Sequence, residues 1–228
     1  GPGGPPPLIL VGQFPAQSEH GLIPMAWVLA ANERAEVQTA QRDPLERRIG
    51  VDVARSGADA TVLLLREESR VLDGEQHQSL STMETTGRVV RFARRHNVPW
   101  QQVFVDVIGV GAGVVDRLHE MGHEVEPVNF GTSANDSDRY ANVRAECYWK
   151  LREALRPDAE QPLAIPAGFG RLCSELSGIE WSPTSAGKIL VEPKDKIKKR
   201  IGRSPDFADA LALTYGEPDD CTASMEMW

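Results

Sequence analysis

Four aspartates stand where carboxylates could act together on a phosphate ester. Asp52 lies within the apolar run IGVDV, and Asp106 lies within the run VFVDV. A charge inside a buried strand is costly unless something compensates it. Asp206 and Asp209 are three residues apart at the start of a predicted helix, so they share one helix face. Carboxylates from two strands and one helix can bind two Mg²⁺ or Mn²⁺ ions, because these hard cations prefer oxygen ligands.

Two divalent cations about 3.5–4 Å apart can promote hydrolysis of a phosphodiester, by activating the attacking water and stabilising the leaving oxygen. The cations also offset the repulsion between carboxylates and attract a phosphate backbone. Because water is the nucleophile, no serine, cysteine or histidine nucleophile is needed. The candidate catalytic residues and metal ligands are Asp52, Asp106, Asp209 and Asp206.

Each aspartate also has a structural interpretation when it is taken alone. Ser204 or Asp206 could cap the last helix, where an acid is stabilised by the helix dipole. Asp52 and Asp106 could be turn residues at strand ends. Only the four residues together favour a metal site.

The elements that must position these residues follow from hydrophobic periodicity. Residues 48–53 and 61–65 are expected to form a hairpin, a third strand spans 70–80, and a capped helix spans 81–96. A strand at 103–107, a helix at 109–121 and a strand at 125–130 indicate a parallel crossover. The prediction is an α/β fold whose central mixed sheet has three leading antiparallel strands, then parallel strands, flanked by helices. The remaining predicted elements are a short helix from Pro24, helices at 139–155 and 169–176, a hairpin at 179–182 and 188–191, and a helix at 205–215.

The composition is that of a globular domain. The chain has 228 residues, 41% hydrophobic and 25% charged, and no apolar run reaches the roughly 18 residues that a membrane span needs. The net charge of −8 argues against a uniformly positive nucleic-acid-binding surface. Three cysteines without a CxxC pair suggest neither a disulfide framework nor a zinc site, which fits a reducing compartment.

The ordered set IGVDVARSGADATVLLL, VFVDVIGVGAGVVDRL and RSPDFADALAL resembles the nuclease domain of the large terminase subunit of tailed bacteriophages. The resemblance spans residues 11–215 and implies a ribonuclease H-like fold. It implies a metal-dependent DNA endonuclease that cuts concatemeric viral DNA when genome packaging starts and ends. By the same resemblance Asp52 bridges two divalent cations, Mg²⁺ or Mn²⁺, and Asp106 and Asp209 each bind a cation. Asp206 falls where relatives sometimes have histidine, which leaves its role as a ligand open.

Large terminases carry an ATPase domain with a GxxxxGK[ST] loop before the nuclease domain, and this sequence has no such loop. We therefore expect a tag or flexible lead-in at 1–7, an interdomain linker remnant at 8–47, the nuclease domain at 48–217 and a flexible tail at 218–228. The resemblance implies as partners double-stranded DNA, an N-terminal ATPase domain, the portal and the small terminase subunit. It implies action in the host cell cytoplasm, transiently at the procapsid portal, and not at a membrane.

One basic cluster precedes the last helix and could either contact the DNA backbone or form a solvated helix face. It consists of Lys194, Lys196, Lys198, Lys199, Arg200 and Arg203.

Competing signals remain. The HExxH match from His119 to His123 would suggest a zinc peptidase, but Gly122 predicts that the helix stops before the second histidine. The glycines from Gly109 to Gly113 do not complete a dinucleotide-binding loop. The alternatives to a packaging nuclease are a junction resolvase or transposase of the same fold, or a non-catalytic module that binds DNA or the portal.

Overall fold

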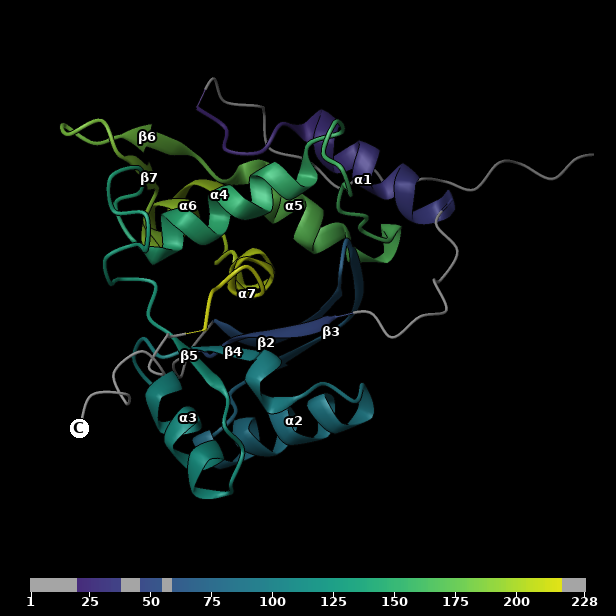
Figure 1. Cartoon of the computed structure of the whole chain (residues 1–228), viewed down its shortest axis with the longest axis vertical. Helices are drawn as coiled ribbons and strands as arrows, with labels where there is room; N and C mark the ends of the chain where they lie inside the picture. Colours follow the sequence, from purple (N-terminus) through teal and green to yellow (C-terminus); the bar gives the residue numbers. More distant parts are fainter. Residues whose placement is uncertain (1–19, 38–45, 55–58, 219–228) are drawn as a thin grey trace, which may run out of the picture.

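The structure is a computed structural model that describes residues 20–37, 46–54 and 59–218 (Figure 1). The helices are α1 (Met25–Val37), α2 (Thr82–Arg95), α3 (Gly111–Glu120), α4 (Val143–Leu155), α5 (Gly170–Gly178), α6 (Lys194–Ile201) and α7 (Asp206–Leu213). The strands are β1 (Arg47–Asp52), β2 (Ala60–Glu67), β3 (Arg70–Gln78), β4 (Val103–Asp106), β5 (Glu126–Val128), β6 (Trp181–Pro183) and β7 (Ile189–Val191). Single 3₁₀ turns lie at Trp100–Gln102 and Ala167–Phe169.

Five strands form one mixed sheet in the order β3-β2-β1-β4-β5. The pairs β1–β2 and β2–β3 are antiparallel, whereas β1–β4 and β4–β5 are parallel. This arrangement confirms the predicted fold class. Because β1 and β4 are adjacent and parallel, their carboxyl ends meet at one edge of the sheet, and each of these two strands ends in an aspartate.

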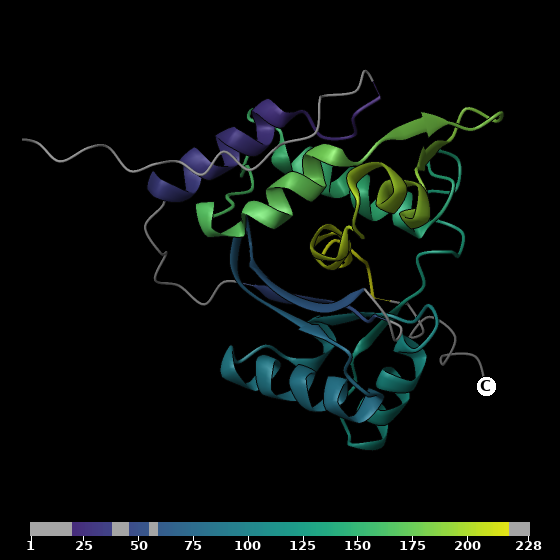
Figure 2. The ribbon, with the colours of Figure 1, turned by 180° about the vertical axis from the view of Figure 1, so that it is seen from behind.

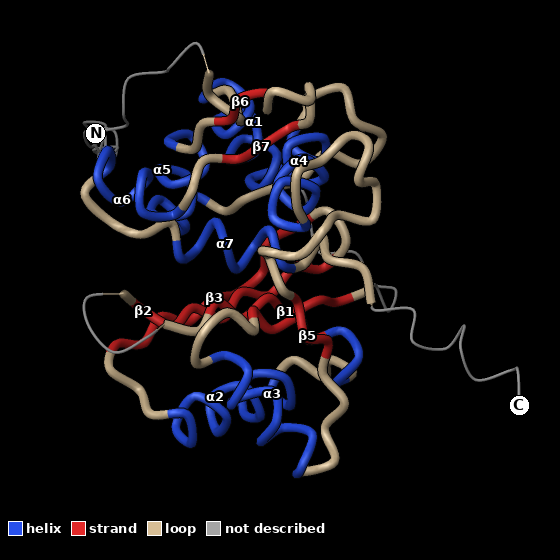
Figure 3. Tube along the Cα trace, turned by 90° about the vertical axis from the view of Figure 1, so that its left-hand side faces the viewer, coloured by secondary structure: helices blue, strands red, loops and turns tan. Residues whose placement is uncertain are grey.

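Helices cover both faces of the sheet (Figures 1 and 2). On one face α2 and α3 pack side by side over an aliphatic cluster that includes Ile49 and Val51 of β1. On the other face α7 lies between the sheet and the layer of α1, α4, α5 and α6 (Figure 3). Because side chains alternate along a strand, Gly50 and Asp52 face α7.

The contact between α7 and β1 depends on a glycine. A Cβ added at Gly50 would stand 1.8 Å from the carbonyl oxygen of Ala210, so any larger residue would push the helix away. The helix sequence DFADALAL is apolar on most sides, and all its residues except Phe207 are buried. Such a helix is stable only inside the molecule. Its first turn is thereby held beside the end of β1.

The segment before β1 contributes to the core. Leu22, Ile23, Val28 and Ala31 belong to the same apolar cluster as α7. The amide of Leu22 donates to the carbonyl of Ile179 at 2.8 Å. Residues 20–37, predicted within a linker, therefore include a packed helix, α1. In the described residues no helix is long and apolar enough to cross a membrane.

Candidate active site

The four predicted aspartates occupy one region, at the carboxyl ends of β1 and β4 and the first turn of α7. Asp52 is the last residue of β1, and Asp106 is the last residue of β4. Asp206 and Asp209 lie on α7, and with Asp52 they are at most 3% exposed. Burial of three carboxylates side by side demands a compensating positive charge.

Lys194 supplies that charge. Its Nζ lies 2.8 Å from Asp52 Oδ2, 3.3 Å from Asp206 Oδ1 and 3.3 Å from Asp209 Oδ2. Sequence reasoning placed Lys194 only among the possible DNA contacts. In the structure the ammonium of Lys194, the first residue of α6, lies between the three carboxylates and contacts an oxygen of each.

Arg144 and Tyr148 hold Asp209 from the opposite side. The guanidinium Nη2 of Arg144 lies 3.0 Å from Asp209 Oδ1, and the hydroxyl of Tyr148 donates to the same oxygen at 2.6 Å. Both side chains come from one face of α4, four residues apart. Burial alone would raise the pKa of Asp209, but Arg144 and Lys194 outweigh burial and lower it. Asp209 is thus kept ionised, with Oδ2 turned to the ammonium.

Asp206 shows the same division between its two oxygens. Its Oδ2 accepts from the Ala60 amide at 3.3 Å and from Nη2 of Arg171 at 3.4 Å. Its buried Oδ1 has no hydrogen-bond partner among the described residues and faces only the Lys194 ammonium. The alternative in which the side chain of Ser204 or Asp206 caps α7 is excluded. No side chain near the start of α7 caps it, and the Ser204 hydroxyl has no hydrogen-bond partner among the described residues.

Asp106 borders a cleft of about 540 Å³ together with Asp209, Lys194 and Arg144. Its Oδ1 accepts from the Ile108 amide at 3.0 Å. Burial, followed by repulsion from Asp209, raises the pKa of Asp106 to about 6. Burial raises the pKa of Asp52 well above its ordinary value, and the neighbouring Asp209 adds to the rise while Lys194 opposes it.

The donor set suits a hard cation, although no three Asp, Glu, His or Cys side chains in the described ranges already form a cation site. Three carboxylates instead surround the Lys194 ammonium. The unbonded Oδ1 of Asp206 and the Oδ2 atoms of Asp52 and Asp209 point to one charge. An all-oxygen set of this kind fits Mg²⁺ or Mn²⁺ better than zinc.

The rest of the basic cluster lies along α6 and just after it. Lys198 pairs with Asp59 at 2.6 Å, and Arg200 pairs with Glu192. Arg203 donates to the Ser174 hydroxyl at 2.7 Å. Lys196 and Lys199 are exposed and form no ion pair with any described residue.

The competing HExxH motif does not form a metal site. Helix α3 ends at Glu120, and Gly122 follows with a φ of +76°. His119 contacts the carbonyl oxygen of Val125 at 3.0 Å, whereas His123 stacks on Trp100 with 3.9 Å between ring centroids. The two histidines therefore do not share a helix face, as the glycine predicted.

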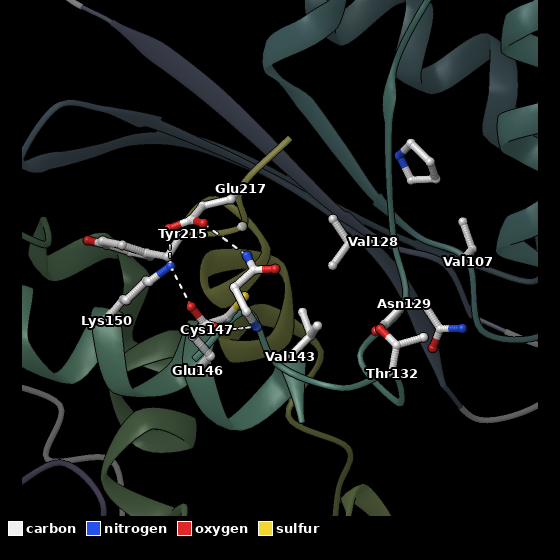
Figure 4. Close-up of a pocket in the computed structure, with 13 residues that line it drawn as sticks. Val107, Val128, Asn129, Thr132, Val143, Glu146, Cys147, Lys150, Tyr215 and Glu217 are labelled. Carbon is white, nitrogen blue, oxygen red and sulfur yellow. Dashed lines mark hydrogen bonds and ion pairs between the residues drawn. The ribbon is translucent and has the colours of Figure 1, made fainter. Parts of the chain in front are cut away.

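A second cavity, of about 370 Å³, lies on another face of α4 (Figure 4). Lys150 sits there 3.0 Å from Glu146 and 2.5 Å from Glu217. None of the four aspartates lines this cavity. Its charged side chains are paired with one another, and two of the four aspartates, Asp106 and Asp209, line the other cleft.

No protein-family model and no curated protein matches the sequence. Solved structures do match. The nuclease domain of the large terminase subunit gp2 of bacterial virus Sf6 aligns over 87% of this chain and 99% of its own, with 20% identity and a TM-score of 0.75. A lysine-to-alanine mutant of that domain with manganese aligns with a TM-score of 0.74, at 20% identity over 87% of this chain and 100% of its own. The large terminase nuclease from thermophilic phage G20c with bound cobalt aligns over 87% and 97%, with 16% identity and a TM-score of 0.59. The chain therefore has the ribonuclease H-like fold of the nuclease domains of phage large terminases.

Proposed function

We propose that this domain is a metal-dependent DNA endonuclease that cuts concatemeric viral DNA when genome packaging starts and ends. One observation carries the proposal. Asp206 and Asp209 each have one oxygen fixed by protein donors, while the other faces a single positive charge that Asp52 shares. Carboxylates that served only folding would not need to converge on one charge at a cleft. The shared fold with terminase nuclease domains supports the choice of DNA as substrate.

In this proposal Asp52, Asp106, Asp209 and Asp206 hold two Mg²⁺ or Mn²⁺ ions. When bound, the ions supply positive charge to the scissile phosphate and make a water molecule more acidic. Arg144 and Tyr148 keep Asp209 ionised and fix its orientation. The Ile108 amide fixes the orientation of Asp106, which lines the same cleft as Asp209.

Lys194 must leave the carboxylates before the full ligand set can bind a cation. Its ammonium contacts three of the four proposed ligands, and about one third of its side chain is exposed. A DNA phosphate entering the cleft offers an alternative partner for the ammonium. We infer that Lys194 competes with the cation in the free protein and contacts DNA in the complex.

Lys196, Lys198 and Lys199 of α6 are proposed to bind the DNA backbone, with Arg200 and Arg203 next to them. The ATPase domain, the portal and the small terminase subunit are proposed as partners in the host cell, on the family resemblance. The proposed nuclease domain includes α1, since Val28 and Ala31 of this helix belong to the core.

Plasmid cleavage tests the proposal. Supercoiled plasmid is incubated with the wild type, Asp52→Asn or Asp116→Asn, in Mg²⁺, Mn²⁺ or EDTA. Asp116 is an exposed acid on α3 and is the matched control. We expect cutting that needs the cation, a loss of at least about a thousandfold in Asp52→Asn, and normal cutting by Asp116→Asn. Equal cutting by wild type and Asp52→Asn would refute the proposal. When branched junctions are offered beside the plasmid, a strong preference for the junctions would favour a resolvase.

A further inference from the structure

Helix α7 lacks a cap of its own. It follows Pro205, which cannot cap with its side chain, and no nearby side chain bonds to its first amides. The first internal hydrogen bond runs from the Asp209 amide to the Pro205 carbonyl at 2.8 Å. The amides between these residues need acceptors from elsewhere, because a buried unpaired N–H is costly.

Glu175 of α5 supplies the acceptor from 32 residues away. Its Oε2 accepts from the Phe207 amide at 2.9 Å and from the Ala208 amide at 3.0 Å. The side chain is completely buried. An acceptor oxygen at a helix N-terminus pairs amides that the helix itself leaves unpaired. Glu175 therefore fixes the rotation and the axial position of the turn that carries Asp206 and Asp209.

Arg171 connects this cap to the site. It precedes Glu175 by one helical turn, and its Nε donates to Glu175 Oε1 at 2.9 Å. Its Nη2 reaches Asp206 Oδ2 at 3.4 Å. One guanidinium thus contacts both the capping carboxyl group and a proposed ligand. A movement of Glu175 would therefore displace Asp206 both through Arg171 and through the backbone amides that Glu175 binds.

The Glu175 carboxyl caps the end of α7 at which the unpaired N–H groups lie. Glu175 binds the two amides that lie between Asp206 and Asp209, so the cap and the proposed ligands share one helical turn. Gly50 permits the close approach of α7 to β1 but has no side chain that could bond to the helix. We propose that Glu175, braced by Arg171, is a positioning residue that aligns the Asp206 and Asp209 carboxylates for cation binding. This inference rests on the proposed nuclease function.

The test compares Glu175→Gln and Glu175→Ala with a matched control, Glu146→Gln. Glu146 is also a buried acid that accepts a backbone N–H, from Asn135 at 2.8 Å, but it lies outside the cleft. Two measurements need no catalysis. Hydrogen exchange of the Phe207 and Ala208 amides reports the cap, and free Mn²⁺ followed by electron paramagnetic resonance reports cation affinity.

We expect the Phe207 and Ala208 amides to exchange about tenfold faster in Glu175→Gln, below the unfolding temperature. Mn²⁺ affinity should fall about tenfold in Glu175→Gln and up to about a hundredfold in Glu175→Ala. In cleavage, kcat should fall while KM for DNA stays constant, and Glu146→Gln should match the wild type. If Glu175→Ala does not fold, Glu175→Gln alone decides, because it keeps the shape and one acceptor.

Each contrary result is informative. Faster exchange with unchanged Mn²⁺ affinity would show that the cap is only structural and would overturn the inference. Unchanged exchange would show that Glu175 does not cap α7. If the wild type binds no Mn²⁺ and cuts nothing, the nuclease proposal itself fails, and the exchange data still decide whether Glu175 holds the helix.

Discussion

The two faces of the five-stranded sheet bury different chemistry. Under α2 and α3 the buried side chains are aliphatic or aromatic, with two buried threonines on α2. On the α7 face the protein buries four acidic side chains near one another, those of Asp52, Asp206, Asp209 and Glu175. The first face is an ordinary apolar core. The second places charges where hydrophobic residues would be more stabilising, as the proposed cation site requires.

Truncation in the apolar face should have the largest effect on stability. Leu118 of α3 is completely buried in the aliphatic cluster. Leu118→Ala should lower the free energy of unfolding by about 2–5 kcal/mol, because it removes transfer energy and leaves a cavity. Cleavage measured well below the unfolding temperature should be unchanged. Urea denaturation measures the change in stability, and plasmid cleavage measures the activity. A large loss of cleavage in the folded variant would show that packing on the apolar face also affects the site on the other face.

Removal of the central ammonium should give a smaller loss that a cation restores. In Lys194→Ala, three buried carboxylates lose their shared positive charge. The metal-free protein should lose about 3 kcal/mol, toward the low end for buried pairs, since the lysine is partly exposed. Added Mn²⁺ should raise Tm more in Lys194→Ala than in the wild type. Thermal unfolding with and without Mn²⁺ checks this, and an equal rise in both proteins would contradict competition between lysine and cation.

The charged face should also make stability depend on pH. Folded Asp106 keeps its proton up to about pH 6, and Glu175, raised mainly by burial, has a pKa of about 7. The unfolded chain releases both protons near pH 4, so the contribution of these two groups to stability is fully present below about pH 4 and is lost as pH rises through 6 to 7. The lowered pKa of Asp209 acts only at more acidic pH.

In EDTA, we therefore expect Tm to fall by roughly 5 °C between pH 5 and pH 8. Asp106→Asn should flatten the part of this slope near pH 6. Differential scanning calorimetry across this range is the measurement. A Tm that rises with pH in the wild type would mean that these carboxyls are not neutral in the fold.

The smallest expected effect separates basic residues by their position. Lys196 and Lys199 are exposed on α6, the helix whose first residue lines the cleft, whereas Arg91 and Arg94 are exposed on α2, across the sheet. The double change Lys196→Gln, Lys199→Gln should reduce the slope of log affinity for DNA against log salt by about 1–2. Arg91→Gln with Arg94→Gln should leave the slope unchanged. Fluorescence anisotropy with duplex DNA measures the slope for both double variants. An equal reduction in both would mean that DNA does not prefer the face that carries α6.

Much of the fold could be predicted because local signals and tertiary needs agree. The capping box at Ser81 and Glu84 starts α2 as predicted. Gly122 ends the turn after α3, which removes the HExxH alternative. The strands at Asp52 and Asp106 follow from their apolar neighbours. The ordered motifs also grouped the four aspartates, and in the structure Asp52 and Asp106 end adjacent parallel strands.

The inner partners of the site could not be predicted, because they come from elements whose spatial order the sequence does not specify. Lys194 looks like one member of a basic run, and only the packing of α6 aims it at Asp52. Glu175 resembles any helical glutamate, and its role depends on α5 lying against the start of α7. Tyr148 has no local pattern that points to Asp209. The helix-capping rule fails beside the candidate site, since the Ser204 hydroxyl does not cap α7.

The central claim is that the buried carboxylates exist to hold divalent cations. The most direct test is the Tm of wild type and Asp209→Asn as a function of Mn²⁺ concentration, in the absence of DNA. Because a ligand that binds only the folded state stabilises it, Tm of the wild type should rise steadily with Mn²⁺, and Asp209→Asn should show little or no rise. An equal rise in both proteins, or none in the wild type at millimolar Mn²⁺, would contradict the claim.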